Sequence, residues 1–218
     1  MRDTILCLCD FTGIMAMPWL EHGYKAILVD PQHVIDHEDG NVLKLARTVE
    51  EAMPIIGDVI CSGRAAFVAS FPPCTDMAVS GARWFAEKYA KDHMFQAKAV
   101  SVAEQCRTIG AVSGAPYMVE NPVSVLSQVF GSPSYTFQPY EYTAYCALDN
   151  YRKRTCLWVG NGFVMPPPET GYVTGRSRRP NSQMSAWKRS GELPQQNSAR
   201  VRQSCIRFKR ENKEVSRR

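Results

Sequence analysis

Short apolar runs alternate with helix-like stretches through the first part of the chain. Residues 4–9, 24–29 and 65–69 are apolar runs of strand length, and residues 16–22, closed by Gly23, form a helix-like stretch between the first two. Continuous apolar runs are typical of strands that are buried on both faces, as in parallel sheets. The pattern therefore predicts a βαβ unit at the start of an α/β fold.

The pattern continues with further elements of both kinds. A helix-like segment covers 49–55, and a long helix is expected over about 84–109 with Gly110 just past its end. Strands are expected at 116–119 and 155–160. Beyond Gly160 the pattern dissolves into a triple proline and basic segments, so we expect one main domain at 1–160 and little regular structure at 161–218.

Composition narrows the class of protein. The 218 residues are 44% hydrophobic, enough for one well-filled core. Eight cysteines occur without a Cys-x-x-Cys pair, which argues against a zinc ribbon or a secreted disulfide framework and favours a reducing cytoplasm. Asp10 interrupts the first apolar run, which we interpret as a strand and not as a signal peptide, and no run is long enough for a membrane helix. His33 and His37 with Glu38 lack a third ligand, so we expect surface positions and no metal.

The charge is divided between the two parts of the chain. Residues 1–150 hold 10 Lys and Arg against 17 Asp and Glu, whereas residues 151–218 hold 16 against 4. A basic C-terminal part next to an acidic body predicts contact with a polyanion such as nucleic acid. A solvated tail is the alternative.

One cysteine follows a Pro-Pro pair directly after a strand-like run. Residues 65–69 lead into Ser70-Phe71-Pro72-Pro73-Cys74. Ligands of α/β sheets bind beyond the carboxyl ends of strands, and the two prolines fix φ and remove two backbone donors there. We therefore expect the Cys74 thiol to project into this crevice as a nucleophile. Otherwise Cys74 is a small buried hydrophobe, as free cysteines commonly are.

A turn and a carboxylate are placed to hold a nucleoside-containing ligand. Phe11-Thr12-Gly13 follows the first strand and Asp30 ends the second. Glycine lets a ligand approach the backbone, and a carboxylate at a strand end can accept hydrogen bonds from ribose hydroxyls. Both features also occur in α/β proteins with purely structural roles.

Two further segments carry candidate chemistry. Glu120 ends the strand at 116–119, and we interpret it either as a turn cap or as a buried carboxylic acid that donates a proton. Arg152 and Arg154 precede the strand at 155–160. Their i, i+2 spacing predicts one shared face, where they bind an acidic group or remain solvated.

In chain order, these segments resemble the DNA (cytosine-5) methyltransferase family, and in particular its short phage or mobile-element members. The resemblance covers about residues 4–160 and rests on Phe11-Thr12-Gly13, Asp30, Asp58, Pro72-Pro73-Cys74, Glu120-Asn121 and residues 150–154. It implies a Rossmann-like, S-adenosylmethionine-dependent methyltransferase fold with a mostly parallel central sheet. The domain at 1–160 would be catalytic, and the basic segment at 161–218 would be a reduced target-recognition region.

The resemblance also implies a role for each matching residue. Cys74 would attack carbon 6 of a flipped cytosine while Glu120 protonates or hydrogen-bonds ring nitrogen 3. Arg152 and Arg154 would steady the base and a catalytic loop at 75–83. S-adenosylmethionine would lie across Phe11, Thr12, Gly13, Asp30, Asp58 and Pro72, with Asp30 on the ribose and Asp58 near the adenine. The implied partner is double-stranded DNA containing cytosine, in the cytoplasm of a bacterial or phage-infected cell and away from membranes.

Three hypotheses on function stay open at this point. The first is an active, minimal cytosine-5 methyltransferase, which retains Cys74 and Glu120. The second is a non-catalytic relative that binds DNA or protein, because Met15 stands where the family usually carries a second glycine and little chain remains after Gly160. The third is a carbon-5 modification of RNA or of a free nucleotide, which the small recognition region favours.

Overall fold

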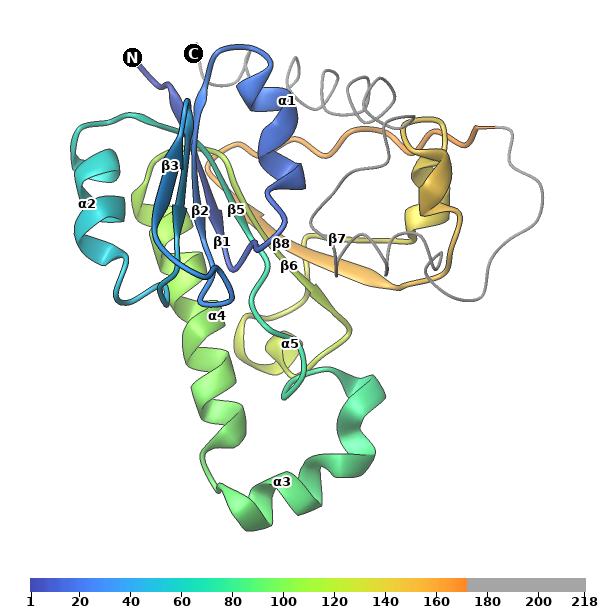
Figure 1. Ribbon diagram of the computed structural model, residues 1–218. Coiled ribbons are helices and arrows are strands. Elements are labelled where there is room, and N and C mark those ends of the chain that lie inside the picture. The colour runs from blue at the N-terminus through green and yellow to red at the C-terminus, as the bar shows by residue number, and fades with distance from the viewer. Residues whose placement is uncertain (172–218) are drawn as a thin grey trace.

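Within residues 1–171, which the computed structural model describes, an eight-stranded sheet forms the centre of the molecule (Figure 1). The strand order is β3-β4-β2-β1-β5-β6-β8-β7. The five strands from β4 to β6 are mutually parallel, whereas β3 and β8 run antiparallel to their neighbours. The predicted α/β class with a mostly parallel sheet is confirmed. Most of the basic segment expected at 161–218 lies outside the described residues.

The strands and helices have the following bounds. The strands are β1 Thr4–Leu8, β2 Lys25–Val29, β3 His37–Asp39, β4 Val42–Leu45, β5 Ala65–Ser70, β6 Tyr117–Pro122, β7 Tyr135–Phe137 and β8 Thr155–Gly160. The helices are α1 Met17–Leu20, α2 Met53–Cys61, α3 Phe85–Lys91, α4 Phe95–Val112 and α5 Leu126–Val129.

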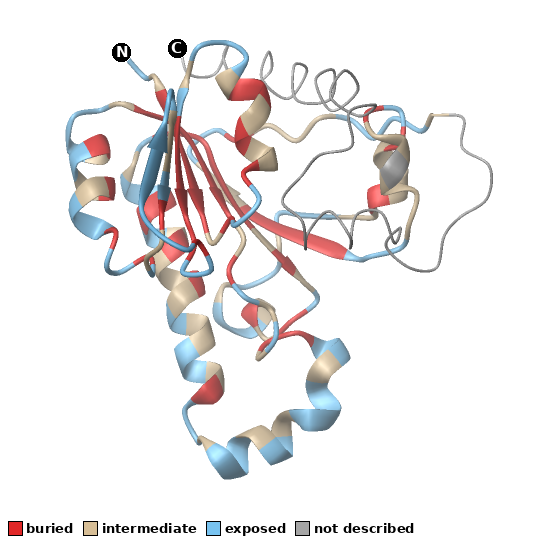
Figure 2. Ribbon diagram, in the orientation of Figure 1, coloured by how far each residue is buried: buried red, intermediate tan, exposed pale blue. Residues whose placement is uncertain are grey.

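Helices cover both faces of the sheet, and α1 lies opposite α2 and α4 (Figure 1). Alternate side chains of a strand point to opposite faces. In β1, Leu6 and Leu8 accordingly join a core cluster with α2 and α4, whereas Ile5 and Cys7 join a second cluster with Trp19 of α1. Burial on both faces explains why the central strands are uniformly buried (Figure 2) and why they form continuous apolar runs in the sequence.

The long helix expected over 84–109 is two helices, α3 and α4. The Asp92 backbone is extended between them, and its carboxylate accepts a hydrogen bond of 2.9 Å from the Met94 N–H at the start of α4. Gly110 does not end the helix, since α4 continues to Val112. A Cβ at Gly110 would lie 2.5 Å from the Tyr117 ring, so this glycine serves close packing against β6.

The chain after β8 remains attached to the same body as far as the structure describes it. Phe163 is buried in the second core cluster. The Tyr142 and Tyr145 hydroxyls donate to the Pro166 and Pro167 carbonyls, each at 3.2 Å. Residues 161–171 therefore pack on the fold despite having no regular secondary structure.

Candidate functional site

The turn that carries Cys74 follows β5 and lies beside the end of β6, the strand that carries Glu120. β5 and β6 are parallel neighbours, with Ser70 paired to Val119, so both continuations start at the same edge (Figure 1). Asn121 is completely buried, and its Nδ2 donates to the Pro72 carbonyl at 3.0 Å. This hydrogen bond fixes the Pro-Pro-Cys turn against the end of β6.

Cys74 occupies a tight turn directly after the two prolines. Its carbonyl accepts hydrogen bonds from the N–H groups of Met77 at 3.0 Å and Ala78 at 2.8 Å. The thiol is half-buried, whereas Cys7, Cys106 and Cys156 are buried in the core. Among residues 1–171, Cys9 and Cys146 are also half-buried, and Cys74 is the one of these three that directly follows the Pro-Pro pair.

The Asn121 hydrogen bond is expected to stabilise the Pro-Pro-Cys turn. Asn121→Ala leaves the Pro72 carbonyl without its partner in a buried place, so we expect a loss of about 1–3 kcal/mol in the free energy of unfolding. Urea denaturation measures the change. Asn41→Ala, at an exposed position, is the control and should differ little from the wild type. Equal stability of Asn121→Ala and Asn41→Ala would contradict a holding role for this side chain.

Glu120 is less buried than expected. Its partner in an ion pair is Lys153, a residue for which no role of its own was predicted. Its side chain is 19% exposed, and Lys153 Nζ lies 3.2 Å from Glu120 Oε1. Arg152 and Arg154 are exposed, and residues 1–171 offer neither of them an ion pair. The expected strand-like alternation fails because 152–154 precede β8 and are not part of it.

A partly buried acid lies nearby, at Asp149. Burial raises the pKa of the Asp149 carboxyl to about 6, and a hydrogen bond with Cys146 opposes this shift. Burial, followed by the Asp149, Cys146 and Glu120 charges, raises the pKa of Tyr151. Asp149 carried no sequence signal, because burial of a polar loop residue leaves no periodic pattern.

The raised pKa of Asp149 predicts how stability depends on pH. A folded-state pKa of about 6 against an ordinary 3.8 means that the folded protein holds this proton longer, so stability falls as pH rises between these values. We expect Asp149→Asn to remove the effect and to gain about 3 kcal/mol relative to the wild type at pH 8, with no such gain below pH 4. Urea denaturation at both pH values tests this. Asp39→Asn, at an exposed position, is the control, and a gain of Asp149→Asn that is equal at both pH values would contradict the prediction.

The turn after β1 is built around Asp10. Asp10 Oδ1 accepts hydrogen bonds from Thr12 N–H (2.9 Å), Thr12 Oγ1 (2.8 Å) and Gly13 N–H (2.9 Å). Gly13 has φ +66°, and a Cβ there would lie 2.6 Å from Leu28 Cδ1, so the turn requires glycine. Asp10 Oδ2 is buried, and no described residue is its partner. The expected Phe11-Thr12-Gly13 turn therefore exists at the carboxyl end of β1.

Asp30 and His33 lie beside this turn, after β2. Asp30 is buried, and its Oδ1 accepts a 2.8 Å hydrogen bond from the Gln32 N–H. His33 was expected at the surface but is only 8% exposed, because its ring packs on Phe11 with centroids 5.3 Å apart. His37 is exposed, as expected. The structure thus brings Phe11, Asp10, Asp30 and His33 together.

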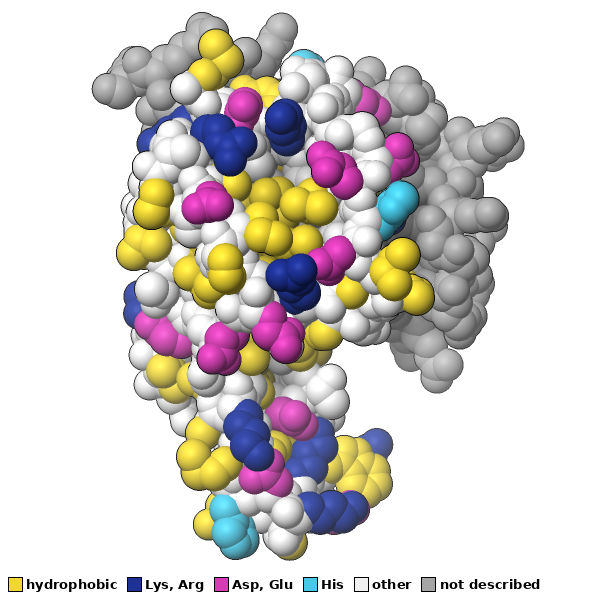
Figure 3. All heavy atoms as spheres, turned by 60° about the vertical axis from the view of Figure 1, so that its left-hand side comes forward, with side chains coloured by type: hydrophobic (Ala, Val, Ile, Leu, Met, Phe, Trp, Pro, Cys, Tyr) yellow, Lys and Arg dark blue, Asp and Glu magenta, His cyan; other side chains and the backbone are white. Residues whose placement is uncertain are grey.

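Asp58 does not belong to this group. It was expected near the adenine, in a segment following a helix, but it is an exposed residue inside α2. With Thr4, Lys25 and Arg64 it lines a hollow of about 290 Å³, where apolar side chains lie between charged ones on this face of the molecule (Figure 3). Because α2 returns the chain to the amino ends of the strands, Asp58 reaches the edge opposite to Cys74. Pro72, in contrast, is buried beside Asn121 at the expected edge.

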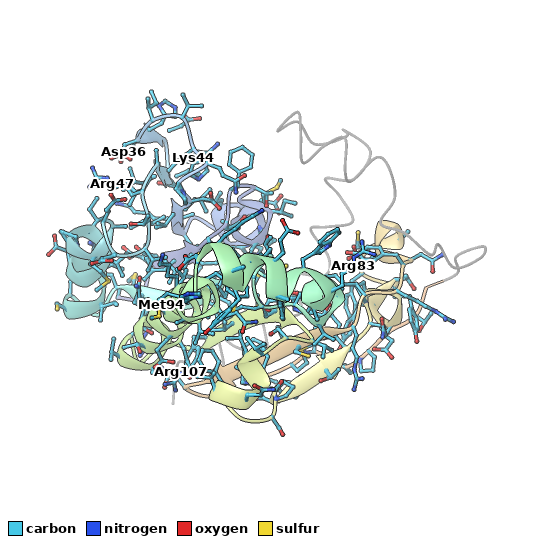
Figure 4. The ribbon with its side chains drawn as sticks, turned by 90° about the horizontal axis from the view of Figure 1, so that it is seen from below. Asp36, Lys44, Arg47, Arg83, Met94 and Arg107 are labelled. Atoms are coloured by element: carbon cyan, nitrogen blue, oxygen red, sulfur yellow. The ribbon has the colours of Figure 1, made fainter. Side chains whose placement is uncertain are left out.

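An arm extends from the carboxyl edge of the sheet (Figure 1). It consists of a 3-10 helix at Val79–Trp84, α3 and the start of α4. Trp84 is 51% exposed, and the Arg83 guanidinium lies over its ring at 5.0 Å. Viewed toward this edge, Lys44 and Arg83 lie on opposite sides of the molecule (Figure 4). Lys88 ties the arm to the Pro-Pro-Cys turn, because its ammonium group donates to the Thr75 carbonyl at 3.0 Å.

Comparison with known proteins adds no relative. Neither the protein-family models nor the curated proteins give a match to this chain. No helix in residues 1–171 is both long and apolar enough to cross a membrane. The same residues hold no group of three or more His, Cys, Asp or Glu side chains that could bind a metal ion.

Proposed function

We propose that the protein transfers a methyl group from S-adenosylmethionine to carbon 5 of a flipped cytosine in DNA. The observation that carries this proposal is the hydrogen bond from Asn121 to the Pro72 carbonyl. It joins the turn of the candidate nucleophile to the strand of the candidate acid, two segments 49 residues apart in the chain. It therefore holds the turn of Cys74 beside the end of β6, the strand that carries Glu120.

The proposed chemistry uses Cys74 and Glu120 on the cytosine ring. The Cys74 sulfur forms a bond to carbon 6 while Glu120 holds a proton at ring nitrogen 3, which makes carbon 5 nucleophilic. S-adenosylmethionine, when bound, supplies the electrophilic methyl group. The hydrogen on carbon 5 then leaves as a proton to water, and the carbon–sulfur bond breaks, which restores Cys74. Lys153, 3.2 Å from Glu120, holds this carboxylate in place in the absence of a base.

The turn after β1 and the end of β2 fit a nucleoside-containing cofactor. Gly13 gives the turn its left-handed backbone, Asp30 directly follows β2 with one carboxylate oxygen on a backbone amide, and Asp10 keeps a buried oxygen without a described partner. Met15 packs with the second core cluster, so its side chain contributes to the core beside α1. This packing weakens the case for a non-catalytic relative.

The strand order supports the same proposal. From β4 to β6 the order matches the first five strands of a doubly wound nucleotide-binding sheet, whose ligands bind beyond the carboxyl ends of the strands. The antiparallel β8 lies between β6 and β7 and leaves the order of these five parallel strands unchanged.

The exposed arm supports a nucleic-acid substrate. A cytosine within a duplex hides carbon 6, so the enzyme must extrude it at a cost of a few kcal/mol. Exposed aromatic and guanidinium groups such as Trp84 and Arg83 stack on bases and can offset this cost. Lys88 connects the arm to the turn of Cys74. The residues proposed to contact DNA are therefore linked directly to the proposed nucleophile.

Transfer of labelled methyl from S-adenosylmethionine tests the proposal. Unmethylated double-stranded DNA, single-stranded DNA, RNA and free cytidine nucleotides are assayed in parallel, and the product base is identified after hydrolysis. We expect 5-methylcytosine in DNA. Label found only in RNA or only in nucleotide would show that this molecule, and not DNA, is the substrate. No transfer to any of them, together with no binding of S-adenosylhomocysteine, would overturn the proposal.

A further inference from the structure

Two buried polar atoms beside the proposed cofactor site have no described partner. One is Asp10 Oδ2 and the other is His33 Nε2, on side chains that are 6% and 8% exposed. Buried polar groups are normally hydrogen-bonded, and an unsatisfied one destabilises the folded protein. Two such atoms on neighbouring residues indicate that a polar group is missing from this place.

The surroundings of His33 restrict what that group can be. The backbone N–H of His33 donates to the Asp30 carbonyl at 3.1 Å. This bond keeps His33 directly beyond the end of β2, where Asp30 is expected to hold a ribose. Phe11 packs on the imidazole at 5.3 Å. Burial lowers the pKa of His33, Lys44 adds to this effect, and Asp30 and Asp10 oppose it. A neutral imidazole next to an aromatic ring and two carboxylates suits a neutral, polar and flat ligand group.

We propose that His33 Nε2 binds the nucleoside end of the cofactor, next to Phe11, and that Asp10 Oδ2 accepts a hydrogen bond from the same ligand. This inference rests on the proposed function and adds two binding residues to it. His33 makes the contact through Nε2, because this ring nitrogen is buried and has no partner among the described residues. Asp10 can do so because its other oxygen is fully used by the turn at Thr12 and Gly13.

Isothermal titration of the full chain with S-adenosylhomocysteine, adenosine and homocysteine tests the inference without an activity assay. His33→Ala should weaken S-adenosylhomocysteine and adenosine about tenfold each and leave homocysteine unaffected. His33→Gln, whose amide reaches the place of Nε2, should retain most of the affinity, whereas His33→Asn, which reaches only the place of Nδ1, should not. Asp10→Asn should weaken S-adenosylhomocysteine, because it can present an N–H where the ligand donates. His37→Ala, the exposed histidine on β3, is the matched control.

The outcomes separate this inference from the proposed function. If the wild type binds neither S-adenosylhomocysteine nor adenosine, both fail. If the wild type binds S-adenosylhomocysteine and His33→Ala binds it equally well, the inference alone is overturned. Should His33→Ala fail to fold, the nitrogen resonances of His33 in the wild type decide: an unchanged Nε2 signal on saturation with S-adenosylhomocysteine contradicts the contact, and a shift of Nε2 supports it.

Discussion

Cys74→Ala is expected to abolish methyl transfer while leaving S-adenosylhomocysteine binding intact. The variant lacks the sulfur that forms the bond to carbon 6, and no other described cysteine occupies the turn after β5. Removal of an enzymic nucleophile typically lowers the rate by about 10⁴-fold or more. The label-transfer assay on double-stranded DNA measures the loss, and titration with S-adenosylhomocysteine shows that the fold and the cofactor site persist.

A matched substitution separates nucleophilic loss from general damage. Cys61→Ala changes an exposed cysteine in α2, at the far edge of the sheet, and should transfer methyl at the wild-type rate. Cys74→Ser keeps the shape of the side chain but offers a weaker nucleophile, so it should resemble Cys74→Ala. If Cys74→Ala retained methyl transfer, the nucleophile would have to be another group.

The parts of the fold that were predictable from sequence are those with burial on both faces. β1, β2 and β5 form continuous apolar runs because helices cover each face of the sheet. The hairpin of β3 and β4 gave no such signal, since β3 is wholly exposed and β4 is partly exposed. The predicted long helix is divided at Asp92, whose extended backbone and local hydrogen bonds, such as the one from the Met94 N–H, are not revealed by periodicity.

The residues of the candidate site were also predictable only in part. Cys74, Asp30 and the Gly13 turn follow strands, so finding the strands located them. Glu120, which was expected just past a strand ending at 119, lies within β6, because this strand continues to Pro122. Asp58 was misplaced because the helix expected at 49–55 lies at Met53–Cys61 and includes this residue. The burial of His33 and the ion pair of Lys153 arise from contacts distant in the sequence, and a single histidine or lysine in a polar stretch carries no sign of them.

Gly160→Ala is expected to cause a large loss of stability, because the Tyr117 ring fills the space where a side chain would go. A Cβ at Gly160 would lie 2.3 Å from Tyr117 Cε1, and one at Gly110 would lie 2.5 Å from Cδ2 on the other side of the same ring. The ring is thus held between β8 and α4 and cannot move away from one glycine without approaching the other. Overpacking of this kind costs about 1–3 kcal/mol and occasionally more, and we expect Gly160→Ala to reach the upper end of that range.

A second glycine provides a control whose substitution should change stability in the opposite direction. Gly57 lies within α2 with no atom near its Cβ position, so Gly57→Ala should stabilise the protein by about 0.5–1 kcal/mol through helix propensity. Urea denaturation of both variants measures the contrast. In a Tyr117→Ala background the ring is absent, and the cost of Gly160→Ala should largely disappear, since residues in direct contact do not contribute additively. An undiminished cost in that background would place its origin in the backbone of β8 and would exclude the Tyr117 ring as the cause.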